Sequence, residues 1–466
     1  MCRKRSGVRC ALAACALCWG AVTAAAPPVV ADPSTDDRTV DALASYIARD
    51  DSSYRLREVS TGHIGATEYV ELILTSQTWR GIPWRHQLFV LRPSRMRSES
   101  RQALLFIHGG RWKEEYEGVR SQVELPREAR LFARLAETMR SPVGVLRQVP
   151  HQPLFERRED ALIAYTFDRY LTTGEPDWPL LLPMVKSAVR GMDAIQEVAK
   201  QRWGLSVETF TVSGASKRGW TSWLTAAIDT RVAAVAPMVI DVLNMLEQID
   251  HQKATWGELS DEIRDYSDLD LPARLRSEPG RALLSIVDPY SYRDRLTQPK
   301  LILLATNDRY WPLDALRLYW ADLPEPKHVL YFPNQGHDFR DFDRLIGSIS
   351  ALHRYSERRE PLPRLSWEFG QEPRRLVLTL QPDRAPQRVR LWTTRSTTRD
   401  FRSVRWVSRS CTRSSGRYVC HATLADAGYT AMFAELSFKD RREPAFSLST
   451  TVCIARPSSE AERLDC

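Results

Sequence analysis

Apolar residues follow two different periods along the chain, and the point where the period changes divides it. In the larger, first part, short and almost continuous apolar runs alternate with segments in which apolar residues recur at helical spacing. The apolar runs predict strands at 69–74, 87–91, 103–107, 207–212, 232–240, 301–305 and 328–332, and the helical spacing predicts helices at 182–198 and 220–228. Strands that alternate with helices in this way indicate an α/β fold, with a mostly parallel sheet flanked by helices on both faces.

Beyond residue 363 the apolar period becomes two. Leu376, Leu378 and Leu380 alternate with polar residues, which is typical of strands with one buried face. We therefore expect a smaller all-β, sandwich-like domain at 364–466, an α/β domain at 32–353, and a charged, proline-containing linker at 354–363. A chain of 466 residues is long enough for two hydrophobic cores.

The N-terminus has the pattern of an export signal, predicted at 1–31. The basic residues of the first ten positions are Arg3, Lys4, Arg5 and Arg9. An apolar run at 10–26 follows them and is too short for a stable membrane span. Cleavage is expected after Ala31, or after Ala25 or Ala26, and would leave a periplasmic or secreted protein. The alternative is a lipoprotein anchored at Cys15.

Four cysteines follow the predicted signal: Cys411, Cys420, Cys453 and Cys466. An even set in an exported protein indicates two disulfides. Of the three possible pairings we favour Cys411 with Cys420 and Cys453 with Cys466, because each closes a short loop. A metal site is the weaker alternative, since the four cysteines include no CxxC pair and no clustered histidines accompany them.

The charge and the motifs exclude several classes of function. The formal net charge is +8, and it falls to +4 without the four basic residues of the signal, which is too small a bias to indicate nucleic acid as a partner. The sequence contains no phosphate loop, dinucleotide fingerprint or zinc motif. We therefore expect no cofactor and no catalytic metal.

Three residues at the ends of predicted strands have the chemistry of a nucleophile, an acid and a base. Ser216 lies in Gly214-Ala-Ser-Lys-Arg-Gly219 between a strand and a helix, which is the layout of a nucleophile elbow, although Gly219 comes one position later than in G-x-S-x-G. Asp308 and His337 each follow a later strand. A serine needs a base, and the base needs a carboxylate, so these residues predict a catalytic triad. Asp241, at another strand end, is the alternative acid.

Acyl transfer also requires amide groups that stabilise an oxyanion, and a pocket for the substrate. The backbone amide of Lys217 is one oxyanion-hole candidate, and those of Gly109 and Gly110 are the others. Tyr310 and Trp311 follow Asp308 and are the pocket candidates. Two arginines close to these candidates, Arg111 and Arg218, are expected to be solvated and are left out of the catalytic assignment.

Several long stretches resemble the PhoPQ-activated pathogenicity-related family of bacterial secreted α/β-hydrolase-like proteins. They are Glu159-Asp-Ala-Leu-Ile-Ala-Tyr-Thr166, Leu182-Pro-Met-Val-Lys186, Gly214-Ala-Ser-Lys-Arg-Gly-Trp220, Pro237-Met-Val-Ile-Asp241, Asp288-Pro-Tyr290, Pro299-Lys300 and Pro333-Asn-Gln-Gly-His337. The resemblance spans about residues 40–450 and implies an exported protein with an α/β-hydrolase core and a C-terminal β domain. It departs at His108-Gly-Gly110, where similar proteins often have Thr-Gly-Gly.

The expected function is that of an exported serine hydrolase, acting on a small ester, amide or peptide substrate through an acyl-enzyme. The alternative is a catalytically silent hydrolase fold that acts as a secreted binding or signalling protein.

Overall fold

The computed structural model describes residues 42–97, 100–118, 125, 128–414, 416–440, 443–457, 462–464 and 466. The predicted signal peptide and Cys15 lie outside the described residues. Within the described part of the chain, no helix is both long and apolar enough to cross a membrane.

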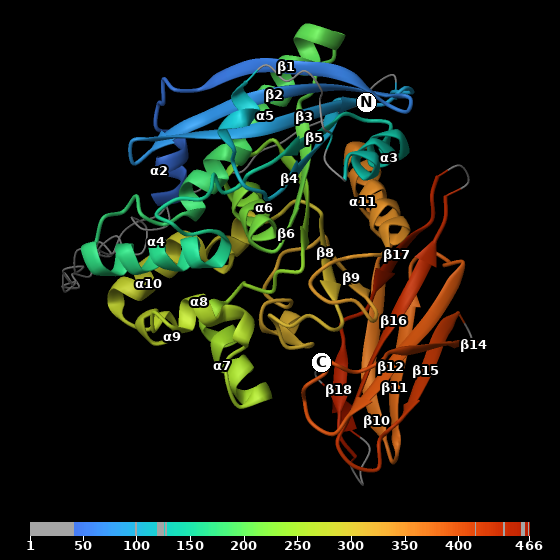
Figure 1. Cartoon of the computed structure of the whole chain (residues 1–466). Coiled ribbons are helices and arrows are strands. Elements are labelled where there is room, and N and C mark those ends of the chain that lie inside the picture. The colour runs from blue at the N-terminus through green and yellow to red at the C-terminus, as the bar shows by residue number, and fades with distance from the viewer. Residues whose placement is uncertain are drawn as a thin grey trace, which may run out of the picture.

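A large sheet runs through the whole molecule (Figure 1). Its first nine strands are β1 (Arg55–Ile64), β2 (Thr67–Trp79), β3 (Ile82–Arg92), β4 (Gln102–Ile107), β5 (Val143–Leu146), β6 (Thr209–Ala215), β7 (Val232–Met238), β8 (Lys300–Ala305) and β9 (Lys327–Phe332). They are arranged in the order β1-β2-β3-β5-β4-β6-β7-β8-β9. The strands from β5 to β9 in this order are parallel, and β1, β2 and β3 are antiparallel.

Helices cover both faces of this sheet. They are α3 (Ala129–Met139), α5 (Leu181–Trp203), α6 (Lys217–Ile228) and α11 (Phe342–Glu357). Helix α2 (Ala42–Ala48) packs on α5, α4 (Glu159–Thr173) packs on the short helices described below, and a short 3-10 helix, η1, spans Glu114–Glu117. Side chains of β4 show how the faces divide: Leu105 and Ile107 pack with α5 and α6, whereas Leu104 and Phe106 pack with α3 and α11. A strand buried on both faces has no polar face to show, which is why its sequence is a continuous apolar run.

A group of short helices between β7 and β8 covers the carboxyl ends of the parallel strands. It contains α7 (Met245–Trp256), η2 (Asp261–Ile263), α8 (Arg264–Ser267), α9 (Leu271–Arg274), α10 (Glu278–Val287) and η3 (Pro289–Arg295). A further 3-10 helix, η4 (Ala315–Leu318), follows β8. The predicted strand at 232–240 ends at Met238, where the chain leaves the sheet to enter this group.

The C-terminal part is a β-sandwich in which one sheet continues the large sheet. Strands β12 (Arg388–Ser396), β13 (Val407–Ser410), β16 (Tyr429–Phe438), β17 (Phe446–Ser449) and β18 (Cys453–Ala455) extend the large sheet beyond β9, where Ser449 pairs with Val329. The second sheet contains β10 (Leu365–Glu372), β11 (Arg375–Pro382), β14 (Thr412–Ser414), β15 (Arg417–Thr423) and β19 (Glu462–Leu464). Residues 354–357 of the predicted linker belong to helix α11. The division of the chain at 354–363 stays a prediction.

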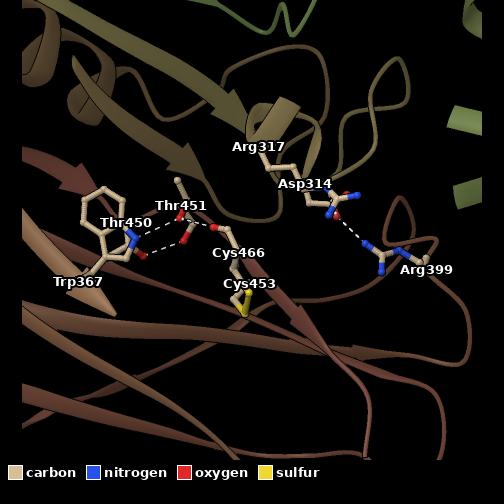
Figure 2. Close-up of a disulfide and its surroundings, with 8 residues drawn as sticks. All are labelled: Asp314, Arg317, Trp367, Arg399, Thr450, Thr451, Cys453 and Cys466. Atoms are coloured by element: carbon tan, nitrogen blue, oxygen red, sulfur yellow. Dashed lines mark hydrogen bonds and ion pairs between the residues drawn. A yellow bond between two sulfur atoms is a disulfide. The ribbon is translucent and has the colours of Figure 1, made fainter. Parts of the chain in front are cut away.

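Both disulfides favoured from the sequence are present, Cys411–Cys420 and Cys453–Cys466. The second joins β18 to the last residue of the chain, whose carbonyl oxygen accepts a 3.0 Å hydrogen bond from the Thr451 hydroxyl (Figure 2). It therefore fixes the C-terminus to the sandwich.

Candidate active site

Ser216 occupies a sharp turn between strand β6 and helix α6. Its backbone has φ 58° and ψ −129°, a conformation that a residue with a side chain adopts only at a cost of about 1–3 kcal/mol. Its amide donates to the Met238 carbonyl (2.8 Å), and its own carbonyl accepts the first bond of helix α6 from Trp220 (3.0 Å). The strained turn is thus held by the neighbouring strand and by the helix.

The spacing of the two glycines around Ser216 follows from how closely the helix approaches the strand. A Cβ at Gly214 would lie 2.7 Å from the Arg218 carbonyl oxygen, and one at Gly219 would lie 2.7 Å from Ile240 Cγ2 and 2.9 Å from the Gly214 carbonyl oxygen. Both positions therefore require glycine. The departure from G-x-S-x-G places the second glycine where α6 crosses β6 and β7.

Asp308 and His337 lie in the loops after β8 and β9, and the structure brings them together. Nδ1 of His337 lies 2.9 Å from Oδ2 and 3.1 Å from Oδ1 of Asp308. Since an ionised carboxylate only accepts, Nδ1 carries the proton and donates it. The amide of Tyr310 donates to Asp308 Oδ1 (2.9 Å), and the Tyr310 ring packs on the imidazole with centroids 4.2 Å apart.

The other ring nitrogen of His337 is available for chemistry. Nε2 is buried and has no hydrogen-bond partner among the described residues. With Nδ1 donating to Asp308, Nε2 is the ring nitrogen that is left to accept a proton. His337 and Ser216 line the same pocket.

Asp241 has a different partner from the one that a catalytic acid requires. Its Oδ1 accepts a 2.5 Å hydrogen bond from the Tyr319 hydroxyl. Burial raises the pKa of Asp241 to about 7, and the negative charge of Asp308 adds to the effect. The structure thus pairs His337 with Asp308 and leaves Asp241 in the core.

The oxyanion-hole candidates lie on two segments that meet at the start of helix α6. Lys217 is the first residue of the helix. A Cβ at Gly109 would lie 2.5 Å from Nη2 of Arg218, so the turn that contains Gly109 and Gly110 contacts the elbow directly. Gly110 has φ 126°, which favours glycine.

A group of charges, which the sequence analysis did not identify, supports this contact; its cations Lys217 and Arg218 are buried, and its carboxylates Glu159 and Asp160 are partly exposed. Arg218 donates to both carboxylate oxygens of Glu159 (2.7 and 2.8 Å) and to the Val149 carbonyl (2.5 Å). The Lys217 ammonium lies 3.1 Å from Glu159 and 2.9 Å from Asp160. Burial alone would raise the pKa of Glu159, but the hydrogen bonds and charge of Arg218 hold it at about 2.

Arg218 is therefore a buried ion-pair partner and not the solvated residue that the sequence suggested, whereas Arg111 is exposed. The signal for the acidic partners was the stretch that begins Glu159-Asp160, which the family resemblance had already singled out.

A pocket with about 750 Å³ of empty space, including its mouth, lies above Ser216 and His337. Tyr310 and Trp311, the two pocket candidates, are among the residues that line it. Most of the remaining wall is apolar and comes from α4, the elbow helix α6, the segment after β7 and the short helices: Phe167, Trp220, Ile240, Val242, Met245, Ile249, Ile263, Tyr266, Leu271, Pro272 and Leu275. Asp160 and Lys217 supply charges at its edge. In the described part of the chain, no group of three or more histidine, cysteine, aspartate or glutamate residues could hold a metal ion.

The strand order and the connections of the large sheet define an α/β-hydrolase fold, which confirms the predicted fold class. The fold begins with antiparallel strands, continues with parallel strands in the order β5-β4-β6-β7-β8-β9, and places a serine in the turn after β6.

The chain belongs to the PhoPQ-activated pathogenicity-related protein family, whose model matches residues 43–402. It is 31% identical over 444 residues to autocrine proliferation repressor protein A of Dictyostelium discoideum, with 85% of each chain covered. Similar solved structures include acetyl xylan esterase 1 from Thermoanaerobacterium sp. JW/SL YS485 (TM-score 0.45, 17% identity, 69% of this chain and 94% of the other). Another is an acetyl xylan esterase from Paenibacillus sp. R4 (TM-score 0.46, 14% identity, 71% and 96%).

Proposed function

We propose that this protein is a serine hydrolase that cleaves an ester or amide bond through an acyl-enzyme, with Ser216, Asp308 and His337 as its triad. The observation that carries the proposal is Nε2 of His337, which is buried and has no hydrogen-bond partner in the described part of the chain. His337 lines the same pocket as Ser216, a serine held in strained backbone geometry. Nucleophilic catalysis requires a base that can take the proton of the serine hydroxyl, and a base and a serine that line one pocket can meet this requirement.

The chemistry follows from the roles of these atoms. Nε2 of His337 takes the proton of Ser216 while the serine oxygen forms a bond to the substrate carbonyl carbon. The backbone amides of Lys217 and of Gly109 or Gly110 stabilise the oxyanion. Collapse of the intermediate breaks the bond to the leaving group, which receives the proton from His337. Water then gives a proton to Nε2 of His337 and forms a bond to the acyl carbon, the bond between that carbon and Ser216 breaks, and the serine oxygen takes the proton back from His337 as the acid leaves.

The pocket indicates the class of substrate. Its wall is largely apolar, so the part of the substrate that lies next to the scissile bond is apolar, and burial of apolar surface supplies its affinity. A small ester, amide or peptide with such a group fits. Export of the protein is part of the proposal and is supported by the two disulfides, which persist in oxidising compartments.

The test is covalent labelling of the purified protein with a fluorophosphonate. Wild-type protein should be labelled, and Ser216→Ala should lose labelling by several orders of magnitude while remaining folded. Ser222→Ala is a matched control, because Ser222 lies on the same helix and donates only to the Arg218 carbonyl. Equal labelling of Ser216→Ala and wild type would contradict the assignment.

A second candidate is a secreted signalling or binding protein without catalysis. It is supported by the relative that is 31% identical and is named as an autocrine proliferation repressor. A folded wild-type protein that no fluorophosphonate labels would favour this candidate.

A further inference from the structure

One loop of the C-terminal β region contacts both loops that carry the acid and the base. It connects β12 to β13, spans residues 397–406 and is called the docking loop here. Its position against the carboxyl ends of β8 and β9 brings residues that are far apart in sequence side by side.

The first contact is made by the residue that precedes Asp308. The side-chain amide of Asn307 donates to three carbonyls of the docking loop, those of Phe401 (3.3 Å), Arg402 (3.3 Å) and Val404 (2.8 Å). A single NH₂ group has two donors, so the three carbonyls share them. The backbone next to the acid is thus fixed by the docking loop.

The second contact is made three residues before His337. The Asn334 side chain donates to the Trp406 carbonyl (3.0 Å) and accepts from the Trp406 amide (2.7 Å). Asn334 has φ 59°, a left-handed conformation that asparagine tolerates. The loops that carry Asp308 and His337 are also joined to each other, since the backbone amide of Asn334 donates to the Thr306 hydroxyl (2.9 Å).

An ion pair and a ring contact add to these hydrogen bonds. Arg399 of the docking loop donates to Asp314 (2.5 Å) (Figure 2). The other carboxylate oxygen of Asp314 lies 2.7 Å from Nε2 of His251 on helix α7. Asp314 is buried and follows the pocket residues Tyr310 and Trp311. The Arg402 guanidinium lies 4.2 Å from the ring centroid of Trp256, also on α7.

The docking loop is itself anchored. Trp406 and Phe401 are buried, and the Trp406 ring packs against Phe433 of β16 with centroids 5.2 Å apart. Loops that carry catalytic groups need a rigid support to keep reacting atoms within a fraction of an ångström. Here the sandwich supplies that support through one loop.

We infer that the C-terminal β region positions the proposed catalytic groups. Its docking loop sets the geometry of the Asp308–His337 pair through two positioning residues, Asn307 and Asn334. The effect of the docking loop on the rate of fluorophosphonate labelling rests on the proposed function. The effect of the docking loop on the hydrogen bond between His337 and Asp308 does not depend on that function.

The experiment compares Asn334→Gly, Asn307→Ala and the control Asp426→Ala. Glycine keeps the positive φ of position 334 and removes only the side-chain bonds. Asp426 lies in the same β region and pairs with Arg374 in an exposed ion pair.

Two readouts are needed. The first is the rate of fluorophosphonate labelling across pH, at a temperature where circular dichroism shows every variant to be folded. The second is the NMR resonance of the His337 Nδ1 proton, identified among the nine histidines by its absence in His337→Gln. We expect labelling to slow by about tenfold or more in both asparagine variants. We expect their Nδ1 resonance to move and broaden, with Asp426→Ala unchanged in both readouts.

The outcomes are separable. A wild-type protein that is not labelled, but whose Nδ1 resonance moves in the asparagine variants, contradicts the hydrolase proposal and supports the positioning role. Variants that label at the wild-type rate and keep the wild-type resonance overturn the positioning role. A lower melting temperature with both readouts unchanged also overturns it, because that is the signature of a structural contact alone.

Discussion

Asp241 and Asp308 are carboxylates at the ends of neighbouring strands, yet their surroundings give them different partners. Asp308 accepts from the Tyr310 amide and from His337, whereas Asp241 has the Tyr319 hydroxyl. Both were candidates for the acid because position along the chain is all that a sequence shows. Which strand-end carboxylate reaches the histidine depends on the path of the loop after the strand.

The raised pKa of Asp241 predicts a pH-dependent stability. Its pKa of about 7 lies above the ordinary value of 3.8, so between these values the folded state binds more protons than the unfolded state. Stability from this group is therefore present at low pH and is lost as pH rises towards 7. Asp241→Asn removes the ionisable group and keeps an acceptor for Tyr319. The free energy of unfolding of Asp241→Asn, relative to that of the wild type, should rise by a few kcal/mol between pH 5 and pH 8.

Urea-induced unfolding of both proteins at several pH values measures this difference. If the difference in free energy of unfolding between the two proteins stays constant from pH 5 to pH 8, Asp241 is ionised in the folded protein over this whole range and the prediction is wrong. Fluorophosphonate labelling should be kept in Asp241→Asn and lost in Asp308→Asn, because only Asp308 contacts His337.

The proposed triad residues could be picked out from the sequence because strand ends, chain order and residue types all point to the same chemistry. The positioning residues could not. Asn307 and Asn334 act through side-chain amides that contact backbone carbonyls and an amide of a loop about 70 to 100 residues away, and a sequence carries no signal for such bonds. Arg218 was misjudged for the same reason: its partner Glu159 lies 59 residues earlier.

At the scale of elements, long apolar runs were predicted well and short elements poorly. Strand β4 is a run buried on both faces, and the structure has it at Gln102–Ile107. Strand β5 has only four residues, and helices α8 and α9 have four each, too few to show a period. The apolar residues of these helices line the pocket, so their spacing reflects the cavity and not a repeating core face.

Two glycines in helices test how tightly the elements pack. A Cβ at Gly347 of α11 would lie 2.2 Å from the Ala445 carbonyl oxygen, just before β17. One at Gly191 of α5 would lie 3.2 Å from a methyl group of Leu146, which can move. We expect Gly347→Ala to cost about 2 kcal/mol or more by forcing α11 away from the sandwich.

Gly191→Ala is the matched control, with a change within about 1 kcal/mol, since alanine favours the helix. Urea-induced unfolding measures both variants. Equal stability of the two would show that the contact between α11 and the segment before β17 is looser than the structure indicates.

At the scale of the whole molecule, the change of apolar period correctly indicated a C-terminal sandwich, but not that the large sheet continues into it. Pairing of Ser449 with Val329 is a property of backbones, and edge strands carry no sequence mark for their partner. Side chains add to the junction: the Ser449 hydroxyl accepts from the Tyr331 amide (3.1 Å), and Arg97 bridges Glu443 (3.0 Å) and Glu357 (3.6 Å).

This shared sheet predicts that the two parts unfold together, although the sequence suggested two domains. Leu378 is fully buried in the sandwich, and Leu105 is fully buried in the parallel sheet. Either leucine changed to alanine should cost about 2–5 kcal/mol. If the junction couples the two parts, both variants lower the midpoint of one calorimetric transition, and the calorimetric enthalpy equals the van't Hoff enthalpy. If the parts are independent, Leu378→Ala produces a separate, earlier transition, while the rest of the protein unfolds at the wild-type temperature.

The loops that carry Asp308 and His337 lie at this junction. A coupled transition therefore also means that a change that destabilises the sandwich destabilises the site. Labelling of Ser216 should then fall at the temperature where the single transition begins.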